Sequence, residues 1–120
     1  MIIGTGIDII EIQRIRSAVK TWGDRFLARV LNPQEIAYAQ AHAVPCQHYA
    51  GRFAAKEAIY KALGDKQVSW KDITIINTPE GKPECHIKGL KHTVHLSISH
   101  SKFYAVASAV VETKDYRPQD

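Results

Sequence analysis

An alanine-rich segment from Gln47 to Leu63 constrains the fold more than any other part of the sequence. It contains five alanines, at positions 50, 54, 55, 58 and 62, and no proline. Alanine has the highest helix propensity, and its small side chain lets neighbouring elements approach closely. Gly64 follows directly and is a natural helix terminator. The segment therefore predicts one long helix that other elements can approach closely.

Two helices and a short helical turn are predicted before this segment. Apolar residues recur at helical spacing from Glu11 to Thr21, and the helical turn is expected over 26–31. The run Asn32-Pro33-Gln34-Glu35 has the residues of a helix start. Its asparagine can cap, its proline fits the first helical position, and its glutamate can reach back to the cap. We expect this third helix to end before Pro45.

Strands are predicted mainly in the second half of the chain. Strand-favouring residues occupy 73–76, 85–87, 95–99 and 104–111, with turns at 79–83 and 100–103. One more strand is predicted over Ile2–Ile10, ending near Asp8. This order indicates an α+β protein, with helices in the N-terminal half packed on an antiparallel sheet. A length of 120 residues without a repeat or linker indicates a single domain over residues 1–120.

The composition disfavours several classes of protein. Hydrophobic residues make up 45% of the chain, which is ordinary for a globular protein. No apolar run approaches the roughly 20 residues that a membrane helix needs. The N-terminus lacks a basic region followed by an apolar stretch, so we expect no signal peptide and a cytoplasmic location. Cys46 and Cys85 lack metal-ligand spacing and are expected to be free thiols.

The predicted long helix carries functional groups on one face. Phe53, Glu57 and Lys61 are spaced i, i+4, i+8 and therefore form one stripe. In one interpretation, Glu57 and Lys61 are a solvated ion pair worth a few tenths of a kcal/mol. In the other, Glu57 binds a cation or accepts a proton while Lys61 meets a phosphate. Spacing alone favours the solvated pair, because exposed pairs of this kind are common.

Asp8 shifts the balance toward the second interpretation. It follows Gly4 and Gly6 at the expected end of an apolar strand, where a carboxylate is otherwise poorly placed. One carboxylate from a strand and one from a helix suit Mg²⁺, which typically takes one or two protein carboxylates plus waters and substrate phosphates. The alternative role for Asp8 is to cap the helix that follows.

A small polar turn provides a second candidate site. His100 lies in Ser97-Ile98-Ser99-His100-Ser101, where Leu96 and Ile98 should face the core. Hydroxyl, imidazole and backbone N–H groups in such a turn can bind a phosphate. A serine hydrolase is disfavoured because no G-x-S-x-G elbow is present. The remaining histidines lack zinc-ligand spacing and are interpreted as surface or structural residues: His42, His48, His86, His92 and His95.

The first predicted helices carry a basic surface. Lysine and arginine outnumber aspartate and glutamate by 16 to 12, which gives a formal net charge of +4. The basic residues gathered here are Arg14, Arg16, Lys20, Arg25 and Arg29, with Ala18 and Phe26 among them. Such a surface suits an acidic helix of a partner protein, or it is a solvated face with no partner.

Three motifs, in this order and at this spacing, resemble the holo-[acyl-carrier-protein] synthase family, the small 4′-phosphopantetheinyl transferases. They are Gly6-Ile7-Asp8 followed by Arg14, Arg52 to Ala58 with Lys61 to Gly64, and Ser97 to His100 leading into Ala105 and Ala107. Gly81-Lys82-Pro83 also agrees with the hairpin turn of that family. The similarity extends over nearly the whole chain, to about Glu112.

The resemblance implies a reaction and its cofactor. Coenzyme A would supply 4′-phosphopantetheine to a serine of apo acyl carrier protein, 3′,5′-ADP would leave, and the product would serve fatty acid biosynthesis. Asp8 and Glu57 would bind Mg²⁺, with Mn²⁺ as an alternative, and Lys61 would meet the diphosphate of coenzyme A. We expect Glu57 to act as the base for the serine proton, directly or through a water bound to the metal.

The resemblance also implies further contacts and an assembly. Arg52, His100 and Ser101 would surround the 3′-phosphate of coenzyme A. The acidic recognition helix of the carrier protein would face three arginines, Arg14, Arg25 and Arg29. The family is typically a homotrimer with active sites between subunits. This sequence departs from the family at Asp65–Trp70, where a further glycine-bearing loop is usual, and there Asp65 adds a negative charge that Lys66 offsets.

Two other functions remain open on the sequence. A non-catalytic relative would bind a nucleotide or an acidic protein without chemistry, but the joint presence of Asp8, Glu57 and Lys61 favours an enzyme. A small basic nucleic-acid-binding module agrees with the charge. However, no nucleic-acid motif is present, and aromatic residues do not interleave with basic ones on a strand face. Neither nucleic acid nor a membrane is therefore an expected partner.

Overall fold

The structure is a computed structural model that describes residues 1–64 and 68–113. Its elements, in chain order, are β1 (Ile2–Glu11), α1 (Ile12–Trp22), α2 (Asp24–Val30), α3 (Pro33–Gln40), α4 (Pro45–Leu63), the short 3₁₀ helix η1 (Trp70–Asp72), β2 (Ile73–Asn77), β3 (Pro83–Ile87), β4 (Thr93–His100) and β5 (Tyr104–Glu112). The α+β class is confirmed, with the α-helices before most of the strands.

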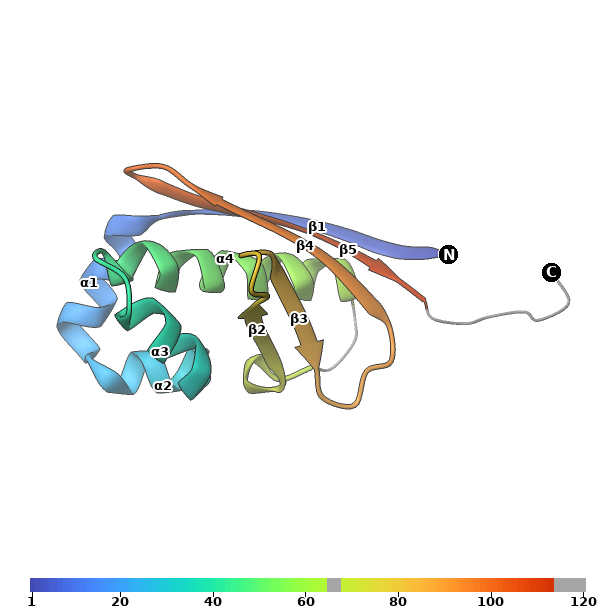
Figure 1. The fold of residues 1–120 in the computed structure, drawn as a ribbon, viewed down its shortest axis with the longest axis horizontal. Coiled ribbons are helices and arrows are strands. Elements are labelled where there is room, and N and C mark those ends of the chain that lie inside the picture. Colours follow the sequence, from blue (N-terminus) through green and yellow to red (C-terminus); the bar gives the residue numbers. More distant parts are fainter. Residues whose placement is uncertain (65–67, 114–120) are drawn as a thin grey trace, which may run out of the picture.

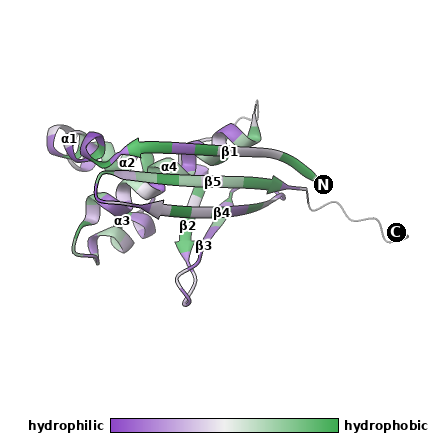
Figure 2. Ribbon diagram, turned by 90° about the horizontal axis from the view of Figure 1, so that it is seen from above, coloured by the Kyte–Doolittle hydropathy of each residue, from purple (hydrophilic) through white to green (hydrophobic). Residues whose placement is uncertain are grey.

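The described strands form two antiparallel sheets around α4. A three-stranded sheet has the order β1-β5-β4, and β2 pairs with β3 in a separate two-stranded sheet. Figure 1 shows the three-stranded sheet along one side of α4, with α3 and the β2–β3 hairpin on the other side. The view from above shows β1, β5 and β4 lying side by side over the helices (Figure 2). The long helix is thus the central element.

Two glycines let β1 lie directly on α4. A Cβ atom at Gly4 would lie 1.8 Å from the carbonyl oxygen of Ala62, and one at Gly6 would lie 1.9 Å from that of Ala58. These distances leave no room for a side chain, so the two backbones are in direct contact. Strand residues two apart face the same side, which places Asp8 on the face of β1 that meets α4.

A buried ion pair joins α3 and α4 to the second sheet. Lys56 Nζ donates to Glu35 Oε1 at 2.8 Å, and both side chains are fully buried. The same ammonium donates to the carbonyl oxygens of Val30 and Trp70. Glu35 Oε2 accepts from the backbone N–H of Ile75 in β2. Burial lowers the pKa of Lys56, while Glu35 opposes that shift.

Most of the predicted helix boundaries are confirmed. Asn32 and Glu35 form the expected capping box at the start of α3. One exception is the short turn expected over 26–31, which is the α-helix α2 over Asp24–Val30. Another is Pro45, which was expected to lie after the third helix and before a helix beginning at Gln47. In the structure, Pro45 is the first residue of α4, a position where a missing N–H costs nothing.

Two strand predictions are wrong in detail. The first strand does not end near Asp8 but continues to Glu11, and Asp8 pairs with Ala107 inside the sheet. Glu11 is the N-cap residue of α1, so Asp8 is not a helix cap. The predicted single sheet is two sheets among the described residues, because β2 and β3 pair only with each other.

Two expectations concern the nature of the chain as a whole. Over residues 1–64 and 68–113, no helix combines the length and hydropathy that a membrane crossing requires. Cys46 and Cys85 are free, as predicted. Burial, with a smaller effect from the Glu35 carboxylate, raises the pKa of the Cys85 thiol to about 12, so this thiol is protonated and unreactive at neutral pH.

Candidate active site

Asp8, Glu57 and Lys61 lie together where β1 packs on α4. Lys61 Nζ donates to Asp8 Oδ1 at 3.1 Å and to the carbonyl oxygen of Ile7 at 3.0 Å. The side chain of Lys61 is 54% exposed and that of Asp8 is 17% exposed. Glu57 precedes Lys61 by one helical turn and interacts electrostatically with both partners. The structure therefore brings together the three residues that the sequence singled out.

The surroundings of Glu57 disfavour its negative charge. Partial burial raises the pKa of Glu57 above its ordinary value, the Asp8 carboxylate raises it further, and Lys61 lowers it. Two neighbouring carboxylates repel each other, and a cation placed between them relieves the repulsion. The site is therefore electrostatically suited to bind a positive ion.

The number and type of the available protein ligands indicate which metal ion would fit between Asp8 and Glu57. The described residues contain no group of three or more histidine, cysteine, aspartate or glutamate side chains that would enclose a metal. A structural zinc site needs four protein ligands, so it does not fit. Mg²⁺ accepts one or two carboxylates and takes its other ligands from waters and substrate phosphates. Asp8 and Glu57 fit an ion of this kind.

Arg52 is the centre of a second group of polar side chains. Its guanidinium donates to Asn77 Oδ1 and lies 4.4 Å from the centroid of the Tyr38 ring. Arg52 is only 4% exposed, and its Nε has no hydrogen-bond partner among the described residues. A buried N–H group without a partner is costly, so an anionic ligand that accepts from Arg52 would be stabilised.

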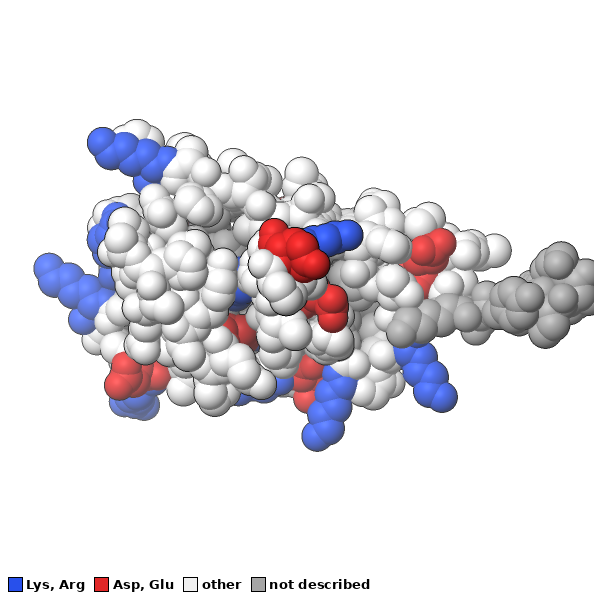
Figure 3. All heavy atoms as spheres, in the orientation of Figure 1, with Lys and Arg blue, Asp and Glu red and all other residues white. Residues whose placement is uncertain are grey.

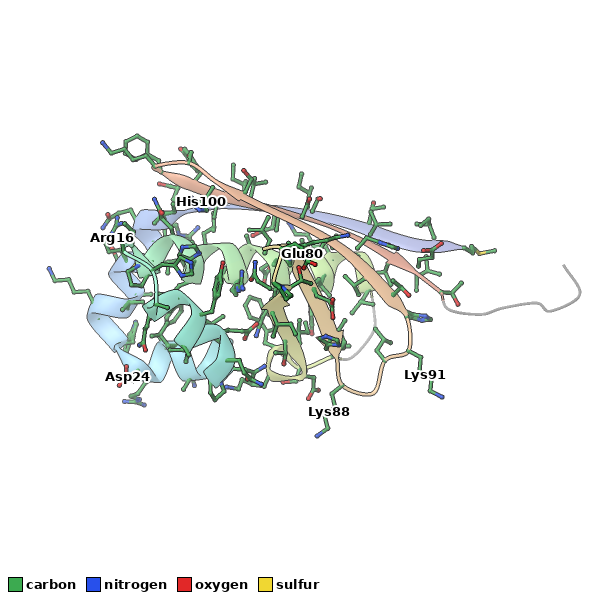
Figure 4. All side chains as sticks on the ribbon, viewed as in Figure 1. Arg16, Asp24, Glu80, Lys88, Lys91 and His100 are labelled. Atoms are coloured by element: carbon green, nitrogen blue, oxygen red, sulfur yellow. The ribbon has the colours of Figure 1, made fainter. Side chains whose placement is uncertain are left out.

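His100 and Ser101 lie at the turn between β4 and β5. The His100 ring is 5.7 Å from that of His48, in an edge-to-face arrangement, and Figure 4 shows it at the end of β4. Ser101 Oγ accepts from the backbone N–H groups of Phe103 and Tyr104. Ser101 thus stabilises the turn, and its hydroxyl proton remains available for donation to a ligand.

The Asp8 group and the Arg52 group are separate within one chain. The charges that act on Glu57 are those of Asp8 and Lys61, whereas Arg52 responds to Tyr38 and Glu35. Five residues along an α-helix correspond to a rotation of about 140°, so Arg52 and Glu57 face different sides of α4. Within one chain, the carboxylates of Asp8 and Glu57 therefore lie on a different side of α4 from the buried guanidinium of Arg52.

The sequence interpretation missed several members of the Arg52 group. His42 and His48 were interpreted as surface or structural residues, which agrees with the exposed His42 and the half-buried His48, but the contact between their rings, 4.1 Å apart, was not predicted. One weak indication of this group was present in the sequence, because His48 precedes Arg52 by one helical turn and so lies on the same face of the helix. No spacing pattern indicated that Asn77 would contact Arg52, because that contact depends on how β2 packs against α4.

The basic surface predicted for the first helices is present and exposed. Arg14, Arg25 and Arg29 are all exposed, and Figure 3 shows lysine and arginine side chains projecting from the end of the molecule that α1 and α2 form. A hollow of about 200 Å³ lies between the arginines of α2, lined by Trp22, Arg25, Phe26 and Arg29. Trp22, the last residue of α1, is 61% exposed.

The segment that departs from the family pattern is only partly visible. Residues 65–67, which include the predicted charges of Asp65 and Lys66, lie outside the described residues. Beyond them, Ser69 caps η1, and the Trp70 ring packs on Phe53 with centroids 4.9 Å apart.

Comparison with known proteins identifies the family. Residues 4–117 match the 4′-phosphopantetheinyl transferase superfamily. The holo-[acyl-carrier-protein] synthase of Oceanobacillus iheyensis is 46% identical, over 96% of this chain and 100% of that protein. That of Koribacter versatilis is 43% identical, over 93% of this chain and 99% of that protein.

Solved structures agree with these sequence matches. A holo-(acyl-carrier-protein) synthase from Bacillus anthracis in complex with CoA (3′,5′-ADP) superimposes with a TM-score of 0.84 at 45% identity, covering 95% of this chain and 99% of that one. The enzyme of Helicobacter pylori in complex with coenzyme A gives 0.82 at 34% identity, covering 90% and 99%.

Fold and site together define the class of protein, a small α+β transferase in which two carboxylates and a lysine meet where β1 packs on α4. The chain belongs to the 4′-phosphopantetheinyl transferase superfamily, and within it to the holo-[acyl-carrier-protein] synthases.

Proposed function

We propose that this chain transfers 4′-phosphopantetheine from coenzyme A to a serine of apo acyl carrier protein and releases 3′,5′-ADP. The meeting of Asp8, Glu57 and Lys61 at one point carries this proposal, because phosphoryl transfer needs both a cation site and a positive side chain. The complexes of the Bacillus anthracis and Helicobacter pylori relatives with coenzyme A support it. The reaction takes place in the cytoplasm and serves fatty acid biosynthesis.

Asp8 and Glu57 hold the metal in this proposal. Mg²⁺ and Mn²⁺ both favour oxygen ligands, so either ion suits the pair. A bound divalent ion supplies charge neutralisation at the diphosphate and makes 3′,5′-ADP a better leaving group. Partial burial and the charge of Asp8 raise the pKa of Glu57, and this electrostatic cost of the ionised carboxylate supports a cation at this position.

Glu57 and Lys61 contribute directly to the transfer. The serine oxygen forms a bond to the phosphorus that carries the pantetheine arm, while the bond from that phosphorus to the 3′,5′-ADP oxygen breaks. Glu57 accepts the serine proton, directly or through a water. The half-exposed Lys61 ammonium stabilises the charge that develops on the phosphoryl oxygens.

Arg52, His100 and Ser101 bind the 3′-phosphate of coenzyme A in this proposal. The buried Nε of Arg52 lacks a partner within the described residues, and a phosphate oxygen is a suitable acceptor for it. The hydroxyl of Ser101 and the imidazole of His100 supply two further donors.

A homotrimer completes the site. The outward face of β1 carries exposed isoleucines, with Ile7 at 63% and Ile9 at 64% exposure, and an apolar strand face of this kind favours burial against another chain. Because Arg52 and Glu57 face different sides of α4, an adjacent subunit can bring its Arg52 group toward the Asp8 group. Coenzyme A would then bind between subunits.

The acyl carrier protein docks on α1 and α2. Arg14, Arg25 and Arg29 provide exposed positive charge for an acidic helix. The hollow that Trp22 and Phe26 line gives an apolar side chain of that helix a place to be buried.

Intact-mass spectrometry tests the proposed function. Apo acyl carrier protein is incubated with this protein, coenzyme A and Mg²⁺, beside a control with a chelator. We expect a mass gain of one phosphopantetheine, located on serine, only when the metal is present. No gain with several carrier proteins, from a correctly folded protein, would show that the chain is a non-catalytic relative.

A further inference from the structure

Four aromatic rings form a continuous cluster beside Arg52, which we call the ring cluster: Tyr38, His42, His48 and His100. The His42 ring lies 4.5 Å from Tyr38 and 4.1 Å from His48. The His48 ring lies 5.4 Å from Tyr38 and 5.7 Å from His100. Arg52 stacks on the Tyr38 ring at 4.4 Å. The cluster joins α3, α4 and the end of β4 around one buried guanidinium.

Hydrogen bonding fixes the tautomer of His42. Its Nδ1 lies 2.7 Å from the carbonyl oxygen of Tyr38. A carbonyl oxygen can only accept, so Nδ1 carries the proton and donates it. In the neutral ring, Nε2 is therefore unprotonated and able to accept a proton.

Partial burial, together with its neighbours, keeps the ring of His48 neutral. Burial has the largest effect and, together with His42, His100 and Arg52, lowers the pKa of His48 to about 4. The charge of Glu35 acts on Arg52, and this carboxylate is itself paired with Lys56. A hollow near the first turn of α4 is lined in part by three further charged side chains, those of Glu11, Arg16 and Lys102.

We propose that His42 and His48 extend the phosphate site of Arg52 and His100, and that binding of a phosphate monoester dianion there draws a proton onto the ring cluster. This inference rests on the proposed function, because it takes the 3′-phosphate of coenzyme A as the dianion. Neither His42 nor His48 was expected to take part in ligand binding.

The change of charge at the site supplies the driving force. Without a ligand, burial and the positive charge of Arg52 both oppose protonation of the His48 ring. A phosphate monoester above pH 7 carries a charge close to −2, since its second pKa is about 6. A dianion bound at Arg52 changes the charge facing the rings from about +1 to about −1, and each imidazole then gains a favourable partner on protonation.

Linkage sets the sign of the pH effect. Because the complex holds more protons than the free protein and free ligand, binding strengthens as the pH falls toward 7. Uptake of about half a proton on binding corresponds to a Kd that becomes roughly threefold lower for each unit by which the pH falls. A ligand without the 3′-phosphate produces no such dependence.

Isothermal titration calorimetry measures the proton uptake directly. Coenzyme A and 3′-dephospho-coenzyme A are each titrated into the whole protein at about pH 7.5, in two buffers that differ in ionisation enthalpy. We expect coenzyme A to bind with uptake of about half a proton or more per site, and 3′-dephospho-coenzyme A to bind with almost none.

Variants assign the uptake to the ring cluster. His48→Phe and His42→Phe keep an aromatic ring but cannot be protonated, and we expect each to lose at least half of the uptake while still binding coenzyme A. His86→Gln is the matched control, because His86 is an exposed histidine on β3 that pairs with Glu84, and it should keep the full uptake.

Each outcome has a separate meaning. Equal proton uptake for the two ligands overturns the inference, and this comparison needs only the unaltered protein. Full uptake in both phenylalanine variants also overturns it. If coenzyme A does not bind and no phosphopantetheine is transferred, the proposed function fails as well, so the two failures are distinguishable.

Discussion

Glu57 is set apart from the other carboxylates of the chain by its position beside Asp8. Folding raises the pKa of Glu57 through burial and through the Asp8 charge. Protonation of Glu57 therefore favours the folded state. That contribution is fully present below the ordinary value of 4.5 and is lost as the pH rises through the folded-state pKa. At neutral pH the ionised Glu57 costs stability, which a bound cation offsets.

The first prediction concerns Glu57 as the base. We expect Glu57→Gln to lower the rate of transfer by about 100-fold or more, because general base catalysis typically contributes that much. Mass spectrometry of the carrier protein measures the rate. Glu80→Gln is the matched control, since Glu80 lies on the exposed turn between β2 and β3 (Figure 4), and it should keep normal turnover. Near-normal turnover of Glu57→Gln would contradict the assignment.

The second prediction concerns the metal and its pH dependence. Thermal unfolding at about pH 7.5 should show a stabilisation by Mg²⁺ of about 2.7 kcal/mol at about 100 times its Kd. The stabilisation should shrink as the pH falls toward the raised pKa of Glu57, because the protonated carboxyl no longer binds the ion. Asp8→Asn should remove most of the effect at every pH. An equal response in Asp8→Asn and the unaltered protein would exclude Asp8 as a ligand.

At the scale of the elements, the structure is organised around α4. One side of this helix meets β1 through backbone contacts at Gly4 and Gly6. Another side buries Lys56, whose ammonium connects α4 to the end of α2, to α3 and to η1. Glu57 therefore lies on a helix that is held from several directions, and Asp8 lies on the strand packed directly against it.

The third prediction concerns the buried Lys56–Glu35 pair. Lys56→Ala leaves Glu35 buried and unpaired, so we expect a loss of about 3–5 kcal/mol in the free energy of unfolding. Lys61→Ala removes an exposed ion pair on the same helix and should cost less than about 1 kcal/mol. Urea denaturation of the two variants compares them. Similar losses would show that the buried pair contributes no more than an exposed one.

Elements fixed by local chemistry were predicted well from the sequence. Alanine content defined α4, and the capping box at Asn32 and Glu35 defined the start of α3. The separation of the strands into two sheets was not predicted, because pairing depends on contacts between distant residues. For the same reason the sequence placed Asp8 at a strand end, whereas it lies inside β1.

The candidate site was likewise predicted where it depended on local sequence and missed where it depended on contacts between distant residues. The Glu57–Lys61 spacing was visible on one predicted helix, and Asp8 was singled out because a carboxylate was unexpected in an apolar strand. The ring cluster was missed because its rings come from α3, α4 and β4, and the turn after α3. No spacing rule within one element brings these rings together.

At the scale of the whole molecule, the separation of Arg52 from Glu57 bears on assembly. One subunit presents the two side chains on different faces of α4, and the exposed isoleucines of β1 offer a surface for another chain. If coenzyme A lies between subunits, each active site combines residues of two chains. Heterologous contacts form a ring when the rotation between subunits closes, and the proposed trimer would be such a ring.

The fourth prediction uses mixed trimers. Glu57→Gln and Arg52→Ala should each be inactive alone. When the two proteins are unfolded together in equal amounts and refolded, about a quarter of the sites should have both residues intact, if subunits combine at random. The mixture should therefore recover about a quarter of the normal rate. A mixture that stays inactive, although it refolds to a trimer in sedimentation, would place both residues in the same subunit's site.

The contact of β1 with α4 through Gly4 and Gly6 affects how this protein tolerates change. Main-chain atoms, which every amino acid shares, set the separation of strand and helix. Substitutions among the surrounding core side chains can therefore accumulate over evolutionary time with little effect on the spacing between Asp8 and Glu57. The same feature gives a protein engineer two positions to leave untouched, Gly4 and Gly6.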